Sequence, residues 1–265
     1  MTNKRLGQHF LQNGAKLQKI ADALEIQKGD VIIEIGPGRG ELTEKLLAAG
    51  ARVIAIEKDV LLWSRPGLDH LEMVYGDVRE KLSVVVKSLE KKPYFLAGNI
   101  PYYLTGYLLR MIGDIEHKPV RTVFTIQKEV AERICKTEEV GMNILAASIL
   151  WWADAAYITT IPRKMFNPPP KIDSAVILLK TKPAFIKGGT RQLRDHADYM
   201  KFVKVLFAHP RKTALSNLLA LYKKKAVLVT FTALDISANI RPERLSFEKI
   251  LELYKTLPSL KDDRP

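Results

Sequence analysis

The sequence predicts an α/β protein with a doubly wound, mostly parallel sheet, followed by a small C-terminal domain made only of helices. Three observations predict this fold. Short apolar runs with the length of buried strands alternate with helical stretches as far as Leu179. Four of these runs end in glycine or in a polar residue, which is typical of the ligand-binding edge of such a sheet. After Leu179 the chain becomes strongly basic and its apolar spacing is helical.

The composition indicates a folded protein with a polyanionic partner. The chain has 265 residues, 47% hydrophobic and 27% charged, which is enough for a sizeable core. Its formal charge is +13, and a net +10 of this lies between Lys180 and Lys225, where 12 Lys and Arg residues are opposed only by Asp195 and Asp198. Such a localised excess favours nucleic acid or an acidic membrane surface.

The sequence gives no sign of a metal site, a disulfide or a membrane span. Cys135 is the single cysteine, and no Cys/His group has zinc spacing. The N-terminus lacks the apolar core of a signal peptide, and the most apolar run, residues 144–153, is too short to cross a bilayer. We therefore expect a cytoplasmic protein that needs neither metal nor membrane.

The chain opens with a basic arm and a helix. Residues 4–13 are basic and contain a glycine and an aromatic residue, which suggests a lid or, alternatively, a frayed terminus. The following helix has its apolar residues at i, i+3, i+4 and i+7: Leu17, Ile20, Ala21 and Leu24.

A glycine-rich turn follows the first buried strand, residues 31–35, and precedes a helix over residues 41–49. Gly36, Gly38 and Gly40 would let the backbone turn sharply and approach a ligand, with the helix N-terminus directing amides at it. The G-x-G-x-G spacing differs from the G-x-G-x-x-G of dinucleotide-binding folds. A plain tight turn is the alternative interpretation.

Acidic residues end the next two strands. Residues 52–56 lead to Glu57, about twenty residues after the turn, where a carboxylate can accept both ribose hydroxyls of a nucleoside. Residues 72–75 lead to Asp77, which can accept from an adenine amino group. Solvated strand-end acids are the alternative.

The strand over residues 94–98 ends in Asn99-Ile100-Pro101-Tyr102. The Asn side chain offers an acceptor and a donor, the Pro stiffens the loop, and the Tyr supplies a flat ring. A nucleobase with an exocyclic amine would bind to such a set, because its N–H groups need acceptors and its ring needs an aromatic surface beneath it. A lone tetrapeptide of this kind is more typical of an ordinary loop, but here Gly36, Glu57, Asp77 and Asn99 fall in order on one rim of the sheet.

Together these motifs resemble the S-adenosylmethionine-dependent methyltransferases that modify amino groups of nucleobases. The residues that carry the resemblance are Glu34-Ile35-Gly36-Pro37-Gly38-Arg39-Gly40, Glu57, Asp77 and Asn99-Ile100-Pro101-Tyr102. Residues 4–11 resemble the opening arm of ribosomal RNA adenine N6,N6-dimethyltransferases. Residues 166–176 are similar to a signature of their small-subunit (KsgA-type) branch. The resemblance extends along the chain to residues 211–218.

The resemblance implies a Rossmann-like methyltransferase sheet that binds S-adenosylmethionine. Its implied cofactor-binding residues are His9, Leu11, Gly36, Gly38, Glu57, Asp77 and Asn99. Its implied catalytic residues are Asn99, Ile100, Pro101, Tyr102 and Phe166. Its RNA-binding candidates are Lys4, Arg5, Lys171, Arg211 and Lys212. His9 stands where the family usually has Asn, so its assignment depends on the backbone.

The implied reaction is dimethylation of the N6 amines of adjacent adenines near the 3′ end of small-subunit ribosomal RNA. The substrate would be a pre-ribosomal small subunit, with the enzyme acting as a monomer in small-subunit biogenesis. Two alternatives remain: a large-subunit ribosomal RNA methyltransferase of the antibiotic-resistance type, and a non-catalytic RNA-binding assembly or transcription factor on the same fold. A nicotinamide-dependent dehydrogenase does not fit the glycine spacing.

The rest of the chain completes the two predicted domains. A fifth strand over 121–127, a helix from 129 and strands over 155–161 and 174–179 close the sheet, with Trp151 and Trp152 as packing residues. Pro168-Pro169-Pro170 would hold Phe166 beside the site. We expect a cofactor-binding catalytic domain over 1–182, including the arm 1–13, and a helical RNA-binding domain over 183–265. Residues 187–190 have the composition of a flexible linker. We expect the helices of this domain over 199–208, 212–221 and 246–257, and a solvated lysine run at 223–225.

Overall fold

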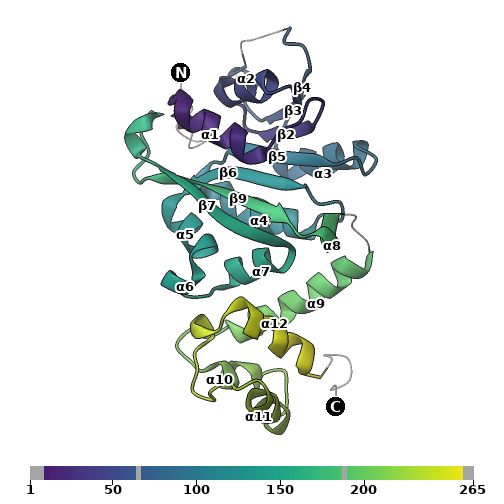
Figure 1. Cartoon of the computed structure of the whole chain (residues 1–265), viewed down its shortest axis with the longest axis vertical. Coiled ribbons are helices and arrows are strands. Elements are labelled where there is room, and N and C mark those ends of the chain that lie inside the picture. Colours follow the sequence, from purple (N-terminus) through teal and green to yellow (C-terminus); the bar gives the residue numbers. More distant parts are fainter. Residues whose placement is uncertain (1–8, 64–66, 187–189, 259–265) are drawn as a thin grey trace.

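The structure is a computed structural model that describes residues 9–63, 67–186 and 190–258. Figure 1 shows a twisted sheet with helices packed on both faces and a group of helices beyond it. The sheet has seven strands in the order β4-β3-β2-β5-β6-β9-β7. This architecture confirms the predicted doubly wound α/β fold.

All the strands expected of the sheet are present, with small shifts at their ends. Five run parallel: β2 (Val31–Ile35), β3 (Arg52–Glu57), β4 (Leu71–Tyr75), β5 (Tyr94–Asn99) and β6 (Arg121–Gln127). β9 (Ser174–Thr181) runs antiparallel between β6 and β7 (Ala153–Ile161), as expected of a closing hairpin. The chain passes outward from β2 to β4 and then returns to β5 on the other side of β2, which makes the β2/β5 edge a topological switch point.

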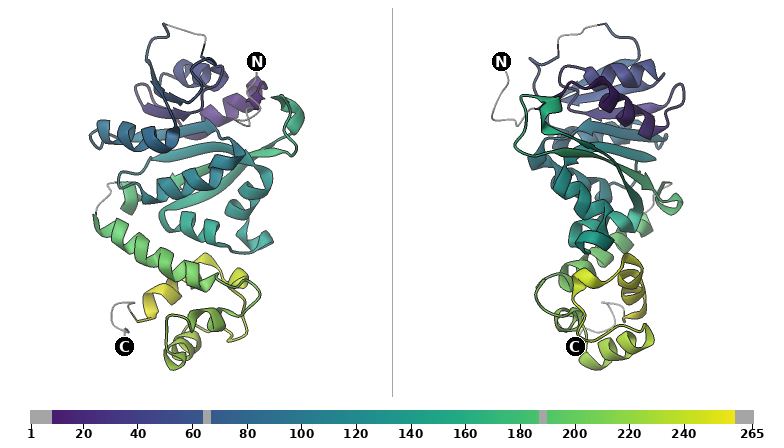
Figure 2. Two further views of the ribbon diagram at one scale, coloured as in Figure 1. Left: turned by 180° about the vertical axis from the view of Figure 1, so that it is seen from behind. Right: turned by 60° about the vertical axis from the view of Figure 1, so that its left-hand side comes forward.

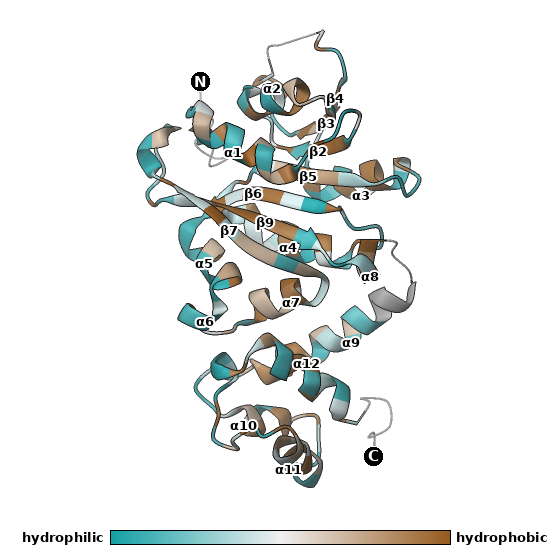
Figure 3. Cartoon of the chain, in the orientation of Figure 1, coloured by the Kyte–Doolittle hydropathy of each residue, from teal (hydrophilic) through white to brown (hydrophobic). Residues whose placement is uncertain are grey.

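Helices bury both faces of the sheet, which explains why its inner strands, unlike the edge strands β4 and β7, are apolar on both sides. One face packs against α1 (Gly14–Leu24) and α2 (Glu41–Ala48). The other packs against α3 (Val78–Ser88), α4 (Thr105–Asp114), α5 (Lys128–Cys135) and α7 (Ile144–Trp152), with α6 (Thr137–Val140) following α5. In Figure 3 the covering helices α1 and α2 each carry hydrophilic and hydrophobic residues, as elements with one buried face do.

The described residues after β9 form helices only. These are α8 (Pro183–Ile186), α9 (Thr190–Leu206), α10 (Ala214–Leu218), α11 (Lys224–Ala233) and α12 (Phe247–Thr256). The views in Figure 2 show α9 leading from the sheet into the group formed by the last three helices. Trp151 stacks on Tyr199 of α9, with ring centroids 4.2 Å apart, and Trp152 is buried in the sheet core. Both tryptophans therefore pack as predicted.

Two predictions in this helical region were wrong in detail. α9 begins nine residues before 199, because His196 is also buried against the sheet domain, next to Gly113 of α4. α10 ends at Leu218 instead of 221. The lysines of the run 223–225 are exposed, as predicted, but they lead into a helix that was not predicted, α11, which buries Val227 and Phe231 at i and i+4. Residues 187–189 of the expected linker lie outside the described residues, and the 182/183 domain boundary stays a prediction.

Two negative findings apply to the described part of the chain. None of its helices has the length and apolar character needed to cross a bilayer. Within the same residues, no three His, Cys, Asp or Glu side chains come together as a metal site would require.

Glu34 is a carboxyl group buried in the centre of the sheet. It is 1% exposed, and its Oε2 accepts a hydrogen bond of 2.7 Å from the Thr43 hydroxyl of α2. Burial raises the pKa of Glu34 to about 8, although the Thr43 bond opposes the shift. Glu34 is therefore mostly uncharged at neutral pH.

We expect Glu34→Gln to make the protein more resistant to rising pH. The folded chain holds the Glu34 proton up to about pH 8, whereas the unfolded chain releases it near 4.5. The free energy of unfolding should therefore fall by about 1.4 kcal/mol per pH unit across this window, and the variant should lack this contribution. Denaturant unfolding at several pH values measures the difference, with exposed Glu80→Gln as the control. Parallel pH profiles for Glu34→Gln and the unsubstituted protein would contradict this account.

Candidate active site

The carboxyl ends of four parallel strands meet around one pocket at the switch point. Gly36 after β2, Glu57 at the end of β3, Asp77 after β4 and Asn99 at the end of β5 all line it. His9, Ile100, Pro101, Tyr102 and Phe166 line the same pocket. The pocket thus brings together residues as distant in the sequence as His9 and Phe166, which are 157 positions apart.

The glycine-rich turn is tied to the acid of the neighbouring strand. Gly36, Gly38 and Gly40 have φ angles of 66°, 59° and 87°, in the left-handed region that favours glycine. The Gly38 amide donates to Glu57 Oε2 at 3.2 Å, and the Asp59 amide donates to Glu57 Oε1 at 2.8 Å. Glu57 is only 6% exposed, so these bonds hold its carboxylate in place beside the pocket.

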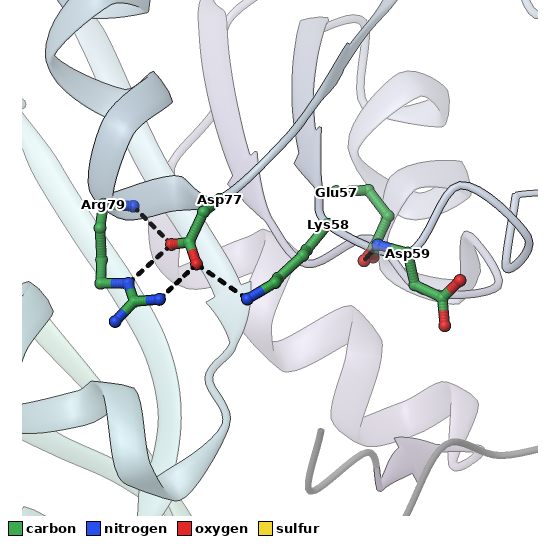
Figure 4. A network of polar contacts seen from close by, with 5 residues as sticks. All are labelled: Glu57, Lys58, Asp59, Asp77 and Arg79. Carbon is green, nitrogen blue, oxygen red and sulfur yellow. Dashed lines mark hydrogen bonds and ion pairs between the residues drawn. The ribbon is translucent and has the colours of Figure 1, made fainter. Parts of the chain in front are cut away.

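Asp77 is the second carboxylate of the pocket, and it caps helix α3 (Figure 4). Its oxygens accept from the backbone amide and the guanidinium of Arg79 and from the ammonium of Lys58. Hydrogen bonds from Arg79, with a smaller contribution from Lys58, hold the pKa of Asp77 well below its usual range. The carboxylate is therefore ionised at any physiological pH.

This part of the pocket fits a nucleoside. The glycine turn presents backbone without side chains, Glu57 offers acceptors for ribose hydroxyls, and Asp77 offers them for a base amino group. Between these polar groups the lining is apolar, from Ile35, Ile56, Leu62 and Val78. The residues present therefore suit S-adenosylmethionine, whose adenosine part needs acceptors at both ends and an apolar slot between them.

Asn99 is fixed in orientation by the N-terminal arm. Its Nδ2 donates to the backbone carbonyl of His9 at 2.7 Å. Because a carbonyl only accepts, the amide nitrogen must face His9, and Oδ1 is left to face elsewhere. The next residue, Ile100, donates its amide to the Thr125 carbonyl of β6 at 3.0 Å, which anchors the loop to the sheet.

The arm joins three parts of the site. Its two-residue strand β1 (Phe10–Leu11) pairs antiparallel with β8 (Phe166–Asn167), so Leu11 lies opposite Phe166. The His9 ring bonds to the Pro168 carbonyl at 2.7 Å. Phe10 packs so closely on the glycine turn that a Cβ on Gly38 would lie 2.9 Å from its ring.

Aromatic rings flank the far side of the pocket. Tyr102 is half-buried, and its hydroxyl shares a hydrogen bond of 3.0 Å with the Ser174 hydroxyl of β9. Burial raises the pKa of Tyr102, so its ring stays neutral. Phe166 is 4% exposed and is held by the β1–β8 pairing.

The remaining candidates lie apart from the pocket. Leu11 is buried beneath it, in the core with α1 and α2. Lys171 is exposed on the proline loop, and Arg211 and Lys212 are exposed in the turn between α9 and α10. Lys4 and Arg5 lie outside the described residues. The pocket also contains residues that sequence reasoning missed, among them Phe10, Lys58 and Ser174.

A family model and two relatives that match this chain are all named as ribosomal RNA methyltransferases. The family model described as ribosomal RNA adenine dimethylase matches residues 1–258. The ribosomal RNA small subunit methyltransferase A of Mycoplasma mycoides is 33% identical over 95% of this chain and 96% of its own. The protein of the same name from Fusobacterium nucleatum is 33% identical over the same shares.

Two solved structures have a similar fold. A dimethyladenosine transferase from Plasmodium falciparum superposes with a TM-score of 0.75, at 25% identity, over 92% of this chain and 96% of its own. The 23S ribosomal RNA methyltransferase ErmE gives a TM-score of 0.73, at 21% identity, over 94% and 99%. The likeness to ErmE concerns the fold alone.

A pair of glycine substitutions tests the contact between the arm and the glycine turn. Gly36→Ala and Gly38→Ala both place a side chain in the left-handed region, at about 1–2 kcal/mol. Only at Gly38 would the new methyl group also collide with Phe10, which we expect to cost about 1–3 kcal/mol more. Denaturant unfolding measures both losses, and limited proteolysis should cut the arm faster in Gly38→Ala. Equal losses and equal cutting would show that Phe10 does not pack on the turn.

Proposed function

The chain belongs to the ribosomal RNA adenine dimethylase family, and from this premise we propose that it dimethylates the N6 amines of adjacent adenines near the 3′ end of small-subunit ribosomal RNA. S-adenosylmethionine is the methyl donor. The single observation that carries the proposal is the fixed orientation of Asn99, whose Nδ2 is bound by His9. The small-subunit choice follows the names of the relatives that are 33% identical along the chain.

The cofactor supplies a methyl group on a positively charged sulfur, which is already activated for transfer. Glu57 and Asp77 bind its adenosine part, and the glycine turn lets the backbone approach it. His9 takes part through its backbone, since its ring is directed to Pro168.

Asn99 and Ile100 prepare the adenine amine for attack. The N6 lone pair of adenine is delocalised into the ring, so the nitrogen is a poor nucleophile. Asn99 Oδ1 and the Ile100 carbonyl each accept one N–H of this amine, which favours a pyramidal nitrogen with its lone pair directed at the methyl group. If the Asn99 amide were flipped, its NH2 group would face the amine, donor against donor. The His9 carbonyl prevents this flip.

Tyr102 and Phe166 hold the base. A base inside a helix is out of reach of these groups, so the adenine must leave its stack before it enters the pocket. Once there, it lies against the Tyr102 ring, which the Ser174 bond keeps in place, and beside Phe166. Positioning and electrostatics then account for the catalysis.

The charge distribution suits a large RNA substrate. Lys171, Arg211 and Lys212 are exposed at separate parts of the surface, the last two in the helical region. Cations spread in this way contact phosphates along an extended RNA surface, and such contacts position a substrate without reading its sequence. As part of the same proposal, the substrate is a pre-ribosomal small subunit in the cytoplasm, and the protein acts as a monomer in biogenesis. The exposed Arg211 and Lys212 support RNA binding by residues 183–265.

Incubation with labelled S-adenosylmethionine and separate ribosomal subunits that lack the modification tests this function. We expect label as dimethyladenosine in the small subunit only. Asn99→Ala should lose at least about 100-fold in rate while it still binds the cofactor, because it removes an acceptor for the reacting amine.

The other outcomes of this assay are equally informative. Label in the large subunit would replace the proposed substrate, and no label in either would favour a non-catalytic RNA-binding factor. A fully active Asn99→Ala would refute the role given to Asn99.

A further inference from the structure

The carboxylate of Asp77 carries as many donors as it can accept (Figure 4). Oδ1 accepts from the backbone amide of Arg79 at 3.0 Å and from its Nε at 2.9 Å. Oδ2 accepts from the Arg79 Nη2 at 2.6 Å and from Lys58 Nζ at 3.0 Å. An ionised carboxylate has about four lone-pair positions, and all are used here. An adenine amino group can bind Asp77 only if one of these donors leaves.

The two cations differ in how firmly they hold this carboxylate. Arg79 contributes three donors, one of them a backbone amide fixed by the start of α3. Lys58 contributes a single ammonium on a flexible four-carbon stem, and its side chain is 50% exposed. Displacement of Lys58 therefore breaks one bond and releases a side chain into water, whereas displacement of Arg79 breaks a bidentate pair.

Lys58 also lines the pocket between its two carboxylates. It follows Glu57 directly in the chain and lines the same pocket. Its side chain extends from the end of β3 to Asp77, between the acid assigned to the ribose and the acid assigned to the base.

We propose that Lys58 competes with the adenine of the cofactor for Asp77 Oδ2, so that cofactor binding exchanges the Lys58 ammonium for the adenine amino group. The inference rests on the proposed function, since it assumes that Asp77 receives an adenine. It makes Lys58 a residue that lowers the affinity of the pocket and weakens its preference for a 6-amino purine. A 6-oxo purine would accept from Lys58, whereas it has no amino group to donate to Asp77.

Binding calorimetry with S-adenosylhomocysteine tests the competition. This ligand has no sulfonium charge, so loss of the Lys58 charge cannot favour it by simple attraction. We expect Lys58→Met to bind it about two- to fivefold more tightly, the effect of one partly exposed ion pair. Salt should strengthen binding to the unsubstituted protein, because it screens the Lys58–Asp77 pair, and should leave Lys58→Met unaffected.

Two controls separate competition from a general change in charge. Lys87→Met removes an exposed cation about 15 Å further along α3 and should leave the affinity unchanged. The deaminated ligand, with hypoxanthine in place of adenine, should bind Lys58→Met no more tightly than it binds the unsubstituted protein.

Each result decides the matter. Equal or weaker binding of S-adenosylhomocysteine by Lys58→Met, or an equal gain for the deaminated ligand, would overturn the role of Lys58 and leave the proposed function standing. If the unsubstituted protein bound no S-adenosylhomocysteine at all, the proposed function would fail, and this inference with it.

Discussion

The hydrogen bond from the Asn99 side chain to the His9 carbonyl is the interaction on which the site depends. It joins the end of β5 to the N-terminal arm, and it is the reason why one particular Asn99 atom is left for a substrate. The arm reaches Asn99 because β1 pairs with β8, and the same pairing positions Phe166. Phe10 of the same strand packs on Gly38. A single extended segment therefore sets the geometry of the cofactor loop, the substrate acceptor and the aromatic wall together.

The parallel sheet positions the polar residues of the site. Its register brings Glu57, Asp77 and Asn99 to one edge, although each lies at or just after the end of a different strand. The two carboxylates differ in surroundings. Glu57 accepts from two backbone amides, whereas Asp77 accepts from a backbone amide, the Arg79 guanidinium and the Lys58 ammonium. The first is ready to accept ribose hydroxyls, and the second must exchange a partner to accept a base. The two carboxylates therefore differ in what ligand binding requires: Asp77 must give up a hydrogen bond, and Glu57 does not.

The sequence predicted the sheet and the pocket well because both follow from local patterns. Apolar runs identified the strands, and residues directly after those strands, such as Gly36 and Asn99, necessarily meet at one edge. The arm was harder, since the pairing of Phe10 with Asn167 joins segments 157 positions apart and only two residues long. Lys58 and Arg79 were missed because a charged residue at a strand end or helix start is usually solvated, and only the folded geometry shows that both reach Asp77. α11 was missed because three lysines hid the spacing of Val227 and Phe231.

Hydrogen exchange with and without S-adenosylhomocysteine tests most directly the central claim, that distant segments and the arm form one cofactor site. Slower exchange should appear together in five segments: residues 9–11, 36–40, 57–59, 76–78 and 99–102. The arm is the decisive segment. Its amides, residues 9–11, should exchange more slowly with the ligand only if the contact between His9 and Asn99 holds the arm on the site in solution. Protection of the glycine turn with unchanged exchange in residues 9–11 would contradict the account, as would protection confined to the helices after Thr181.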